Sequence, residues 1–151
     1  MNQLKLKSTF IGMLALAGFG LISATTEDKK EIKKIEETIQ EFVATADAQD
    51  ADKMNEILDP NFSSVANQLF GSETTSITSR DTYIQMLRDK KIGGDKRTVE
   101  VLSVDVNGNN AYAKAIFDGS KLKFTTYIFL AKDKNGIWRI VTDYPSIEMK
   151  G

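Results

Sequence analysis

The sequence contains no cysteine and no histidine among its 151 residues. Without cysteine there is no disulfide, no thiolate nucleophile and no iron–sulfur ligand, and without histidine there is no imidazole base or imidazole metal ligand. The net charge of −1 also lacks the excess of Lys and Arg that nucleic-acid binding requires. Any catalysis would therefore use carboxylate, tyrosine, lysine, arginine or hydroxyl groups. We expect no metal, no tightly bound cofactor and no nucleic-acid partner.

The N-terminal segment, residues 1–24, has the pattern of a secretory signal peptide. Lys5 and Lys7 precede an apolar run over residues 10–22, and small residues before a cleavage point end at Ala24. The run is shorter than the roughly 20 residues that a permanent transmembrane helix needs. We therefore expect cleavage after Ala24 and an exported protein, periplasmic or extracellular, that has no membrane association afterwards. An uncleaved N-terminal anchor is the alternative.

The remaining residues, 25–151, have the length of one domain, and their first part is helical in pattern. Apolar residues at spacings of three and four predict an amphipathic helix over residues 28–48. Asp50 is a suitable N-cap for a second helix that runs to Leu58, and Pro60 is expected to end it.

A third helix is predicted to begin after Thr78 or Ser79, either of which is a suitable N-cap, and to stop before Gly93-Gly94. Residues 62–78 are ambiguous: their pattern also fits two short strands around the turn at Gly71-Ser72. The number of strands in the sheet is therefore open at this point.

The last third of the chain is typical of strands joined by tight turns. Asn-Gly pairs begin at positions 107 and 135 and an Asp-Gly pair at 118, and such pairs tolerate the positive φ of tight hairpins. Strands that follow helices without a helix between them indicate an α+β fold with a four-stranded antiparallel meander. Val99 and Val101 are out of phase with Leu102, which predicts a bulge in the first strand. The predicted strands cover residues 97–106, 111–118, 121–131 and 137–144.

One face of each strand is more apolar than the other, and we expect this face to lie against the helices. Together with the apolar helix faces it provides candidate lining for an internal pocket whose only polar groups are hydroxyls and one indole N–H. Such a pocket suits a small hydrophobic or aromatic molecule. The alternative is that these side chains simply fill the core. The candidates are Phe42, Phe62, Tyr83, Leu87, Phe117, Phe124, Thr126, Trp138, Thr142 and Tyr144.

Ionisable side chains fall on the opposite strand faces, away from a substrate, which favours a non-catalytic protein. A bulge would turn Asp143 or Glu100 inward, and burial beside a tyrosine would raise the pKa of that carboxyl toward a value useful for proton abstraction. The five residues assigned to the outer faces are Lys114, Asp118, Lys123, Arg139 and Asp143.

The outer face of the predicted meander is itself partly apolar. A patch of this kind usually marks an interface, so we expect a homodimer through the outer sheet face. The alternative is that a terminal segment of the same chain covers it. The residues of the patch are Tyr112, Ile116, Tyr127, Phe129, Ile137 and Val141.

Several sequence segments resemble a known family. They are Leu58-Asp59-Pro60-Asn61-Phe62, Thr78-Ser79-Arg80, the Asn107-Gly108 turn followed by Ala111-Tyr112-Ala113, and the closing Asn135-Gly136-Ile137-Trp138-Arg139-Ile140-Val141. In this order, after a long amphipathic helix, they resemble the nuclear transport factor 2-like superfamily, and within it the SnoaL-like and lumazine-binding branch, over about residues 30–146. The resemblance implies a cone, in which a strongly curved sheet wraps around three helices, encloses a pocket and commonly forms dimers through its outer face.

The resemblance leaves the activity open, because one fold hosts many functions. The superfamily includes isomerases, dehydratases, epoxide hydrolases and cyclases beside non-enzymatic binding domains, and its enzymes place Tyr, Asp or His inside the cone. Here Phe42 stands where some members carry a pocket tyrosine, and Ile140 where epoxide-hydrolase-like members carry an aspartate. We therefore expect an exported small-molecule-binding or scaffold domain. The alternatives are a carboxylate and tyrosine acid–base enzyme, or an interaction domain whose own side chains fill the pocket.

Overall fold

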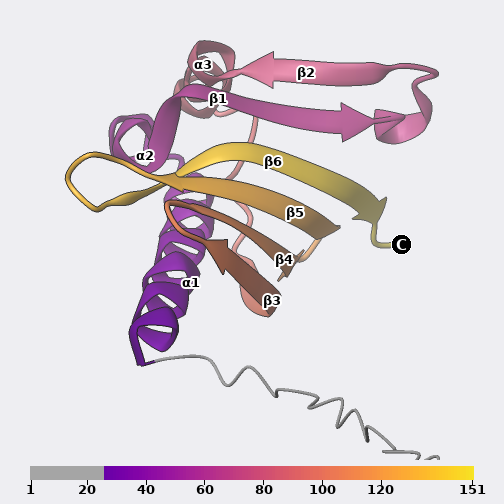
Figure 1. Cartoon of the computed structure of the whole chain (residues 1–151). Coiled ribbons are helices and arrows are strands. Elements are labelled where there is room, and N and C mark those ends of the chain that lie inside the picture. The colour runs from indigo at the N-terminus through magenta and orange to yellow at the C-terminus, as the bar shows by residue number, and fades with distance from the viewer. Residues whose placement is uncertain (1–25) are drawn as a thin grey trace, which may run out of the picture.

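The computed structural model describes residues 26–151 (Figure 1), and the predicted signal peptide lies outside this range. This part of the chain forms three helices and six strands. All the helices lie in its first half, together with the first two strands, and the second half consists of strands alone. The elements are α1 (Thr26–Asp47), α2 (Ala51–Ile57), β1 (Leu58–Asn67), the 3₁₀ turn η1 (Leu69–Gly71), β2 (Thr75–Ser79), α3 (Arg80–Arg88), β3 (Thr98–Asn107), β4 (Asn110–Asp118), β5 (Leu122–Lys132) and β6 (Trp138–Met149).

The helices begin at the predicted caps. The Asp50 side chain accepts a hydrogen bond from the Lys53 N–H at 2.9 Å at the start of α2, and the Ser79 hydroxyl accepts one from the Thr82 N–H at 3.4 Å at the start of α3. The sequence predicted that Pro60 ends the second helix, but α2 already ends at Ile57. The helix passes directly into β1, and Pro60 lies where the pairing of β1 with β6 is irregular, since proline has no N–H to donate.

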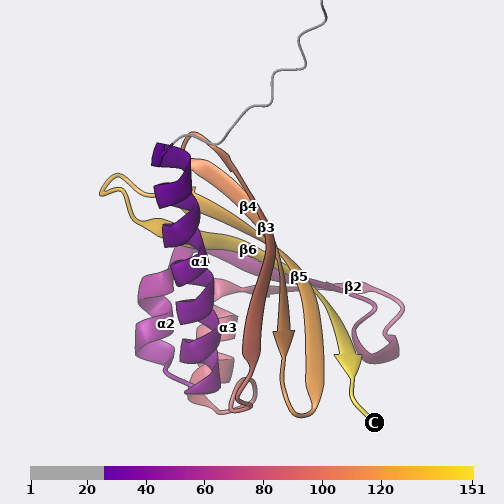
Figure 2. The same cartoon turned by 90° about the horizontal axis from the view of Figure 1, so that it is seen from below.

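The six strands form one sheet in the order β2-β1-β6-β5-β4-β3. Strands β3 to β6 are the predicted antiparallel meander, and the ambiguous segment forms the β1–β2 hairpin. The hairpin joins the meander because β1 runs parallel to β6. The helices gather on one side of the sheet, which curves around them (Figures 1 and 2). The predicted α+β cone is confirmed.

Two β-bulges change the direction of side chains. The predicted bulge in β3 is confirmed between Val101 and Ser103, and it leaves Leu102 45% exposed. A second bulge, which the sequence did not predict, lies in β6. Phe129 of β5 pairs with Thr142, but the next residue of β5, Leu130, pairs with Ile140. From residue 142 onward, β6 therefore has its faces exchanged relative to the predicted alternation.

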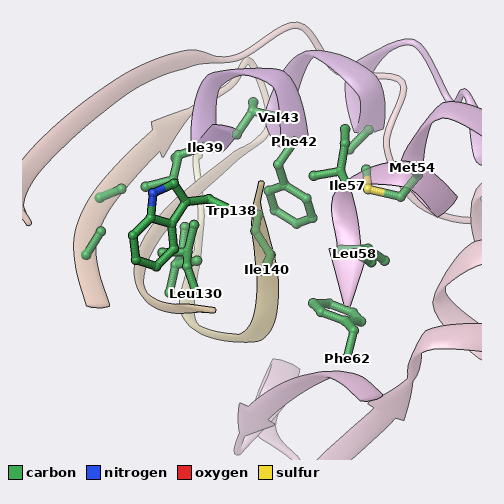
Figure 3. Close-up of a cluster of buried hydrophobic side chains, with 14 of the residues drawn as sticks. Ile39, Phe42, Val43, Met54, Ile57, Leu58, Phe62, Leu130, Trp138 and Ile140 are labelled. Carbon is green, nitrogen blue, oxygen red and sulfur yellow. The ribbon is translucent and has the colours of Figure 1, made fainter. Parts of the chain in front are cut away.

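The core lies between α1, α2 and the inner face of the meander (Figure 3). In α1 the buried positions follow the predicted spacing of three and four, and they include Ile39 and Phe42. Trp138 and Ile140 from the start of β6 and the fully buried Ile128 of β5 pack against them. The burial of these apolar side chains is the main favourable contribution to the free energy of folding. No helix within residues 26–151 combines the length and hydrophobicity needed to cross a bilayer.

Candidate functional site

A cavity of about 450 Å³ lies beside this core. Its walls come from α1, α3, the β1–β2 hairpin and the inner faces of β4, β5 and β6, so it is built from segments far apart in the sequence. The wall is mainly apolar. Four of the predicted pocket residues line it: Phe42, Tyr83, Phe117 and Phe124.

The aromatic rings in the wall support one another. Phe42 is stacked on Tyr83 with 6.2 Å between ring centroids, and it is 6.5 Å from Phe117. Phe62 packs against Tyr83 in a T-shaped arrangement, with 5.3 Å between ring centroids. Contacts of this kind hold the rings in fixed orientations, so the cavity presents preformed aromatic surface.

Four other predicted pocket residues are buried but are not in the cavity wall: Phe62, Leu87, Thr126 and Trp138. Phe62, Leu87 and Trp138 belong to the hydrophobic core. The Trp138 indole N–H donates to the carboxylate of Glu31 at 2.9 Å, which fixes the ring against α1. Thr126 is fully buried, and its hydroxyl reaches a group that does line the cavity.

The predicted inward direction of Thr142 and Tyr144, and the predicted outward direction of Asp143, are wrong. The bulge in β6 places Tyr144 on the outer face, where it is 43% exposed and pairs with Tyr127, and it places Thr142 opposite the exposed Phe129. Asp143 instead points into the cone and lines the cavity at 7% exposure. Pro145 and Ile147 lie on the same strand face as Asp143 and also line the cavity. The sequence signal for the bulge was the apolar Ile147, which regular alternation would place on the opposite face from Ile140.

Asp143 is the central polar group of the cavity. Its Oδ1 accepts a hydrogen bond from the Thr126 hydroxyl at 2.6 Å, and the Ser64 hydroxyl also donates to it. Burial disfavours the charged form and raises the pKa of Asp143 to about 6, although the two hydroxyl donors and the positive charge of Arg97 act in the opposite direction. This carboxyl therefore changes its protonation state near neutral pH.

Arg97, which precedes β3, is a second polar group in the wall that the sequence did not single out. Its Nε donates to the Asp47 carboxylate at 2.6 Å, its backbone N–H donates to the same carboxylate at 2.9 Å, and its Nη2 donates to the Val43 carbonyl at 3.4 Å. The guanidinium also lies over Phe124, 5.3 Å from the ring centroid, and 5.9 Å from that of Phe117. These contacts hold the guanidinium in one position.

Tyr83 supplies the third polar group. Burial and the nearby Asp143 charge raise the pKa of the Tyr83 phenol, so it stays protonated and can donate a hydrogen bond. Within residues 26–151 no group of three or more carboxylate side chains is placed to hold a metal ion. The site is therefore an apolar cavity with a carboxyl, a guanidinium and a phenol in its wall.

This strongly curved sheet wrapped around three helices is the NTF2-like fold. Solved structures share this fold at low sequence identity. An NTF2-like protein from Silicibacter pomeroyi has 22% identity and a TM-score of 0.69, and the match covers 80% of this chain and 98% of that chain. An NTF2-like protein from Shewanella baltica has 16% identity and a TM-score of 0.69, and the match covers 83% of this chain and 98% of that chain. A ketosteroid isomerase-like protein from Erwinia carotovora atroseptica is also similar, with 11% identity and a TM-score of 0.63 over 78% of this chain and 96% of that chain. At these identities the likeness concerns the fold.

The sequence itself assigns the chain to one family within this class. A family model described as "Putative lumazine-binding" matches residues 30–144, nearly the whole described part of the chain. The protein belongs to this family, as its closing Asn-Gly-x-Trp segment predicted. No curated protein shows significant sequence similarity to the chain.

Proposed function

We propose that this protein binds a small, flat and mainly apolar molecule in the cavity of its cone. The observation that carries the proposal is that the cavity remains open, with a volume of about 450 Å³, beside a core that other side chains already fill. Small-molecule sites in proteins typically have volumes of roughly 300–1,000 Å³ and an apolar wall with a few polar groups. An interaction domain whose own side chains occupy the pocket fits this geometry less well.

The shape and chemistry of the wall favour a flat ligand. Phe42, Tyr83, Phe117 and Phe124 offer ring faces and edges that match an aromatic or conjugated molecule. The family description adds support for a ligand of this class, because lumazine is a flat bicyclic heteroaromatic compound. We therefore choose lumazine as the first probe.

The test combines a search for a natural ligand with a titration. Protein purified from its own host is denatured and its extract is searched for small molecules by mass spectrometry, and ligand-free protein is titrated with lumazine. Ala66→Phe should fill the cavity, since Ala66 lines it, whereas Ala131→Phe adds the same ring on the outer sheet face. We expect Ala66→Phe alone to lose binding. An empty extract together with no lumazine binding would contradict the proposal.

A second candidate function, acid–base catalysis, is favoured by one observation: Asp143, with a pKa of about 6, lies in the wall of an apolar cavity that the protonated Tyr83 also lines. A carboxylate of this kind is suited to remove a proton from the carbon next to a ketone and return it two carbons away, while a phenol stabilises the enolate oxygen. A small β,γ-unsaturated cyclic ketone tests this reaction, because its conjugated isomer absorbs in the ultraviolet. Catalysis requires turnover that Asp143→Asn abolishes.

A further inference from the structure

Three polar groups in the cavity wall have hydrogen-bonding capacity that the protein itself does not use. Asp143 receives two hydroxyl donors, fewer than the four or so that a carboxylate accepts. Among residues 26–151, neither Nη1 of Arg97 nor the hydroxyl of Tyr83 has a hydrogen-bond partner. A ligand that pairs these groups while it displaces water from the apolar cavity gains affinity from each hydrogen bond.

Arg97 is oriented before any ligand arrives. Asp47 binds both its Nε and its backbone N–H, and the rings of Phe117 and Phe124 lie against its guanidinium plane. A donor that is already fixed loses little entropy when it binds an acceptor. Arg97 and Asp143 also lie close enough for the charge of one to lower the pKa of the other. Both groups also line the same cavity, so one polar edge of a small molecule bound there can contact both.

We infer, on the basis of the ligand binding proposed above, that the ligand carries a hydrogen-bond donor and an acceptor on one edge, as the N–H and C=O of a cyclic imide, lactam or ureide do. The donor binds the carboxylate of Asp143. The acceptor binds Nη1 of Arg97, with the Tyr83 hydroxyl as a further donor. The rest of the ligand lies among the aromatic rings.

The charges that face Asp143 favour a neutral ligand over an anion. The positive charge of Arg97 is already compensated by Asp47, so an ionised Asp143 gives the inner cavity an excess of negative charge. Tyr83 is neutral, and Lys91 at the cavity wall pairs with Asp89 at 3.2 Å. An anionic ligand would meet repulsion that no free cation offsets in this part of the described chain.

The same geometry makes binding dependent on pH. Protonated Asp143 cannot accept the ligand N–H at the oxygen that carries the proton, so binding competes with protonation. Because the pKa of Asp143 is about 6, the ionised fraction falls on the order of tenfold between pH 7 and pH 5. We expect the affinity for the donor-bearing probe to fall by about the same factor.

The experiment compares lumazine with 1,3-dimethyllumazine, which keeps the flat ring and both carbonyls but lacks both ring N–H donors. Both are titrated into the wild-type protein from pH 5 to pH 7. We expect lumazine to bind about tenfold more tightly at pH 7, and only lumazine to lose affinity on acidification. Asp143→Asn should weaken lumazine binding by about tenfold and remove the pH dependence, whereas Asp105→Asn, the same change on exposed β3, should leave both unchanged.

The role of Arg97 is tested by Arg97→Lys, which keeps a positive charge beside Asp47 but loses the fork of donors. We expect about tenfold weaker lumazine binding with the pH dependence retained, and thermal unfolding checks that the variant is folded. If both probes bind equally and independently of pH, the inference is wrong and the proposed binding function stands. If neither probe binds at any pH and the extract of the protein from its own host is empty, both are wrong. If that extract holds a ligand without a donor and an acceptor on one edge, only the inference is wrong.

Discussion

At the scale of single residues, Glu31 and Asp143 show how neighbours decide the state of a buried carboxyl. Glu31 accepts from Lys132 Nζ at 2.6 Å, Lys34 Nζ at 2.7 Å and Trp138 Nε1 at 2.9 Å, and these donors lower its pKa from the ordinary value to about 2. Asp143 has hydroxyl donors only, and burial raises its pKa to about 6. The first carboxylate stabilises the fold, and the second is available to a ligand.

Glu31→Gln should lower stability at neutral pH, because Lys132 and Lys34 lose their anionic partner and the Trp138 N–H loses a charged acceptor. The folded pKa of Glu31 lies below its unfolded value, so its contribution is present at pH 7 and is lost as pH falls from about 4.5 to about 2. Thermal unfolding followed by tryptophan fluorescence measures this. The wild-type advantage in Tm of several degrees at pH 7 should shrink toward zero near pH 2; an advantage independent of pH would contradict the assignment.

At the scale of elements, the connection from α3 to β3 positions the cavity wall and depends on a close backbone contact. Gly93 has φ of +76°, and a Cβ on it would overlap the carbonyl oxygen of Ala46 in α1. Gly94 donates its N–H to that same oxygen at 3.3 Å. The segment brings Arg97 to α1, where Asp47 holds it. Only glycine permits both the backbone conformation and the approach.

Gly93→Ala should therefore destabilise the fold by about 2–5 kcal/mol, the sum of a left-handed backbone conformation and a steric overlap. Gly136→Ala is the matched control, since Gly136 also has a positive φ, +79°, but has open space around it. It should cost about 1–2 kcal/mol. Urea unfolding of both variants gives the comparison. Equal losses would mean that the contact with Ala46 does not constrain this connection.

The elements also separate what patterns predicted from what they did not. Caps at Asp50 and Ser79 are local signals, and the helices begin there. The β3 bulge was visible because the valine phase changes within one run. The β6 bulge was missed because the predicted strand ended at residue 144, before Ile147 revealed the changed phase. Asp143 and Tyr144 were consequently assigned to the wrong faces.

At the scale of the whole molecule, aromatic side chains remain exposed on the outer face of the meander. Tyr112 pairs across strands with Phe129, and Tyr127 with Tyr144, so they form two neighbouring rows. Each is 43–49% exposed. Rows of aromatic side chains on an exposed sheet face are costly in water and typical of an interface. We propose that two copies of the chain associate through this face.

Sedimentation velocity at micromolar concentration tests this association. We expect a dimer for the wild-type protein and a monomer for Phe129→Glu, which places a charge at the centre of the patch. Ile77→Glu is the control, because Ile77 is 72% exposed on β2, at the far edge of the sheet from the meander, and it should leave the dimer intact. A monomeric wild-type protein would contradict the proposal.

The proposed export is tested on the same scale. Expressed as the full chain in its own host, the mature protein should begin at Thr25 and be recovered outside the cytoplasm. N-terminal sequencing of the purified protein and cell fractionation measure both points. A chain that retains residues 1–24 and sediments with membranes would instead indicate the uncleaved anchor.

The amino-acid sequence by itself determined the family, the fold class, the helix caps and the order of the meander strands, because these depend on local periodicity, turn residues and a recognisable closing segment. Only the tertiary structure decided the chemistry of the cavity. Asp143 faces inward through a bulge, Arg97 comes from a segment without any pattern, and Ser64 reaches the site because β1 lies beside β6. Contacts between segments distant in the chain set the burial and charge of these groups, and alternation within one strand carries no information about them.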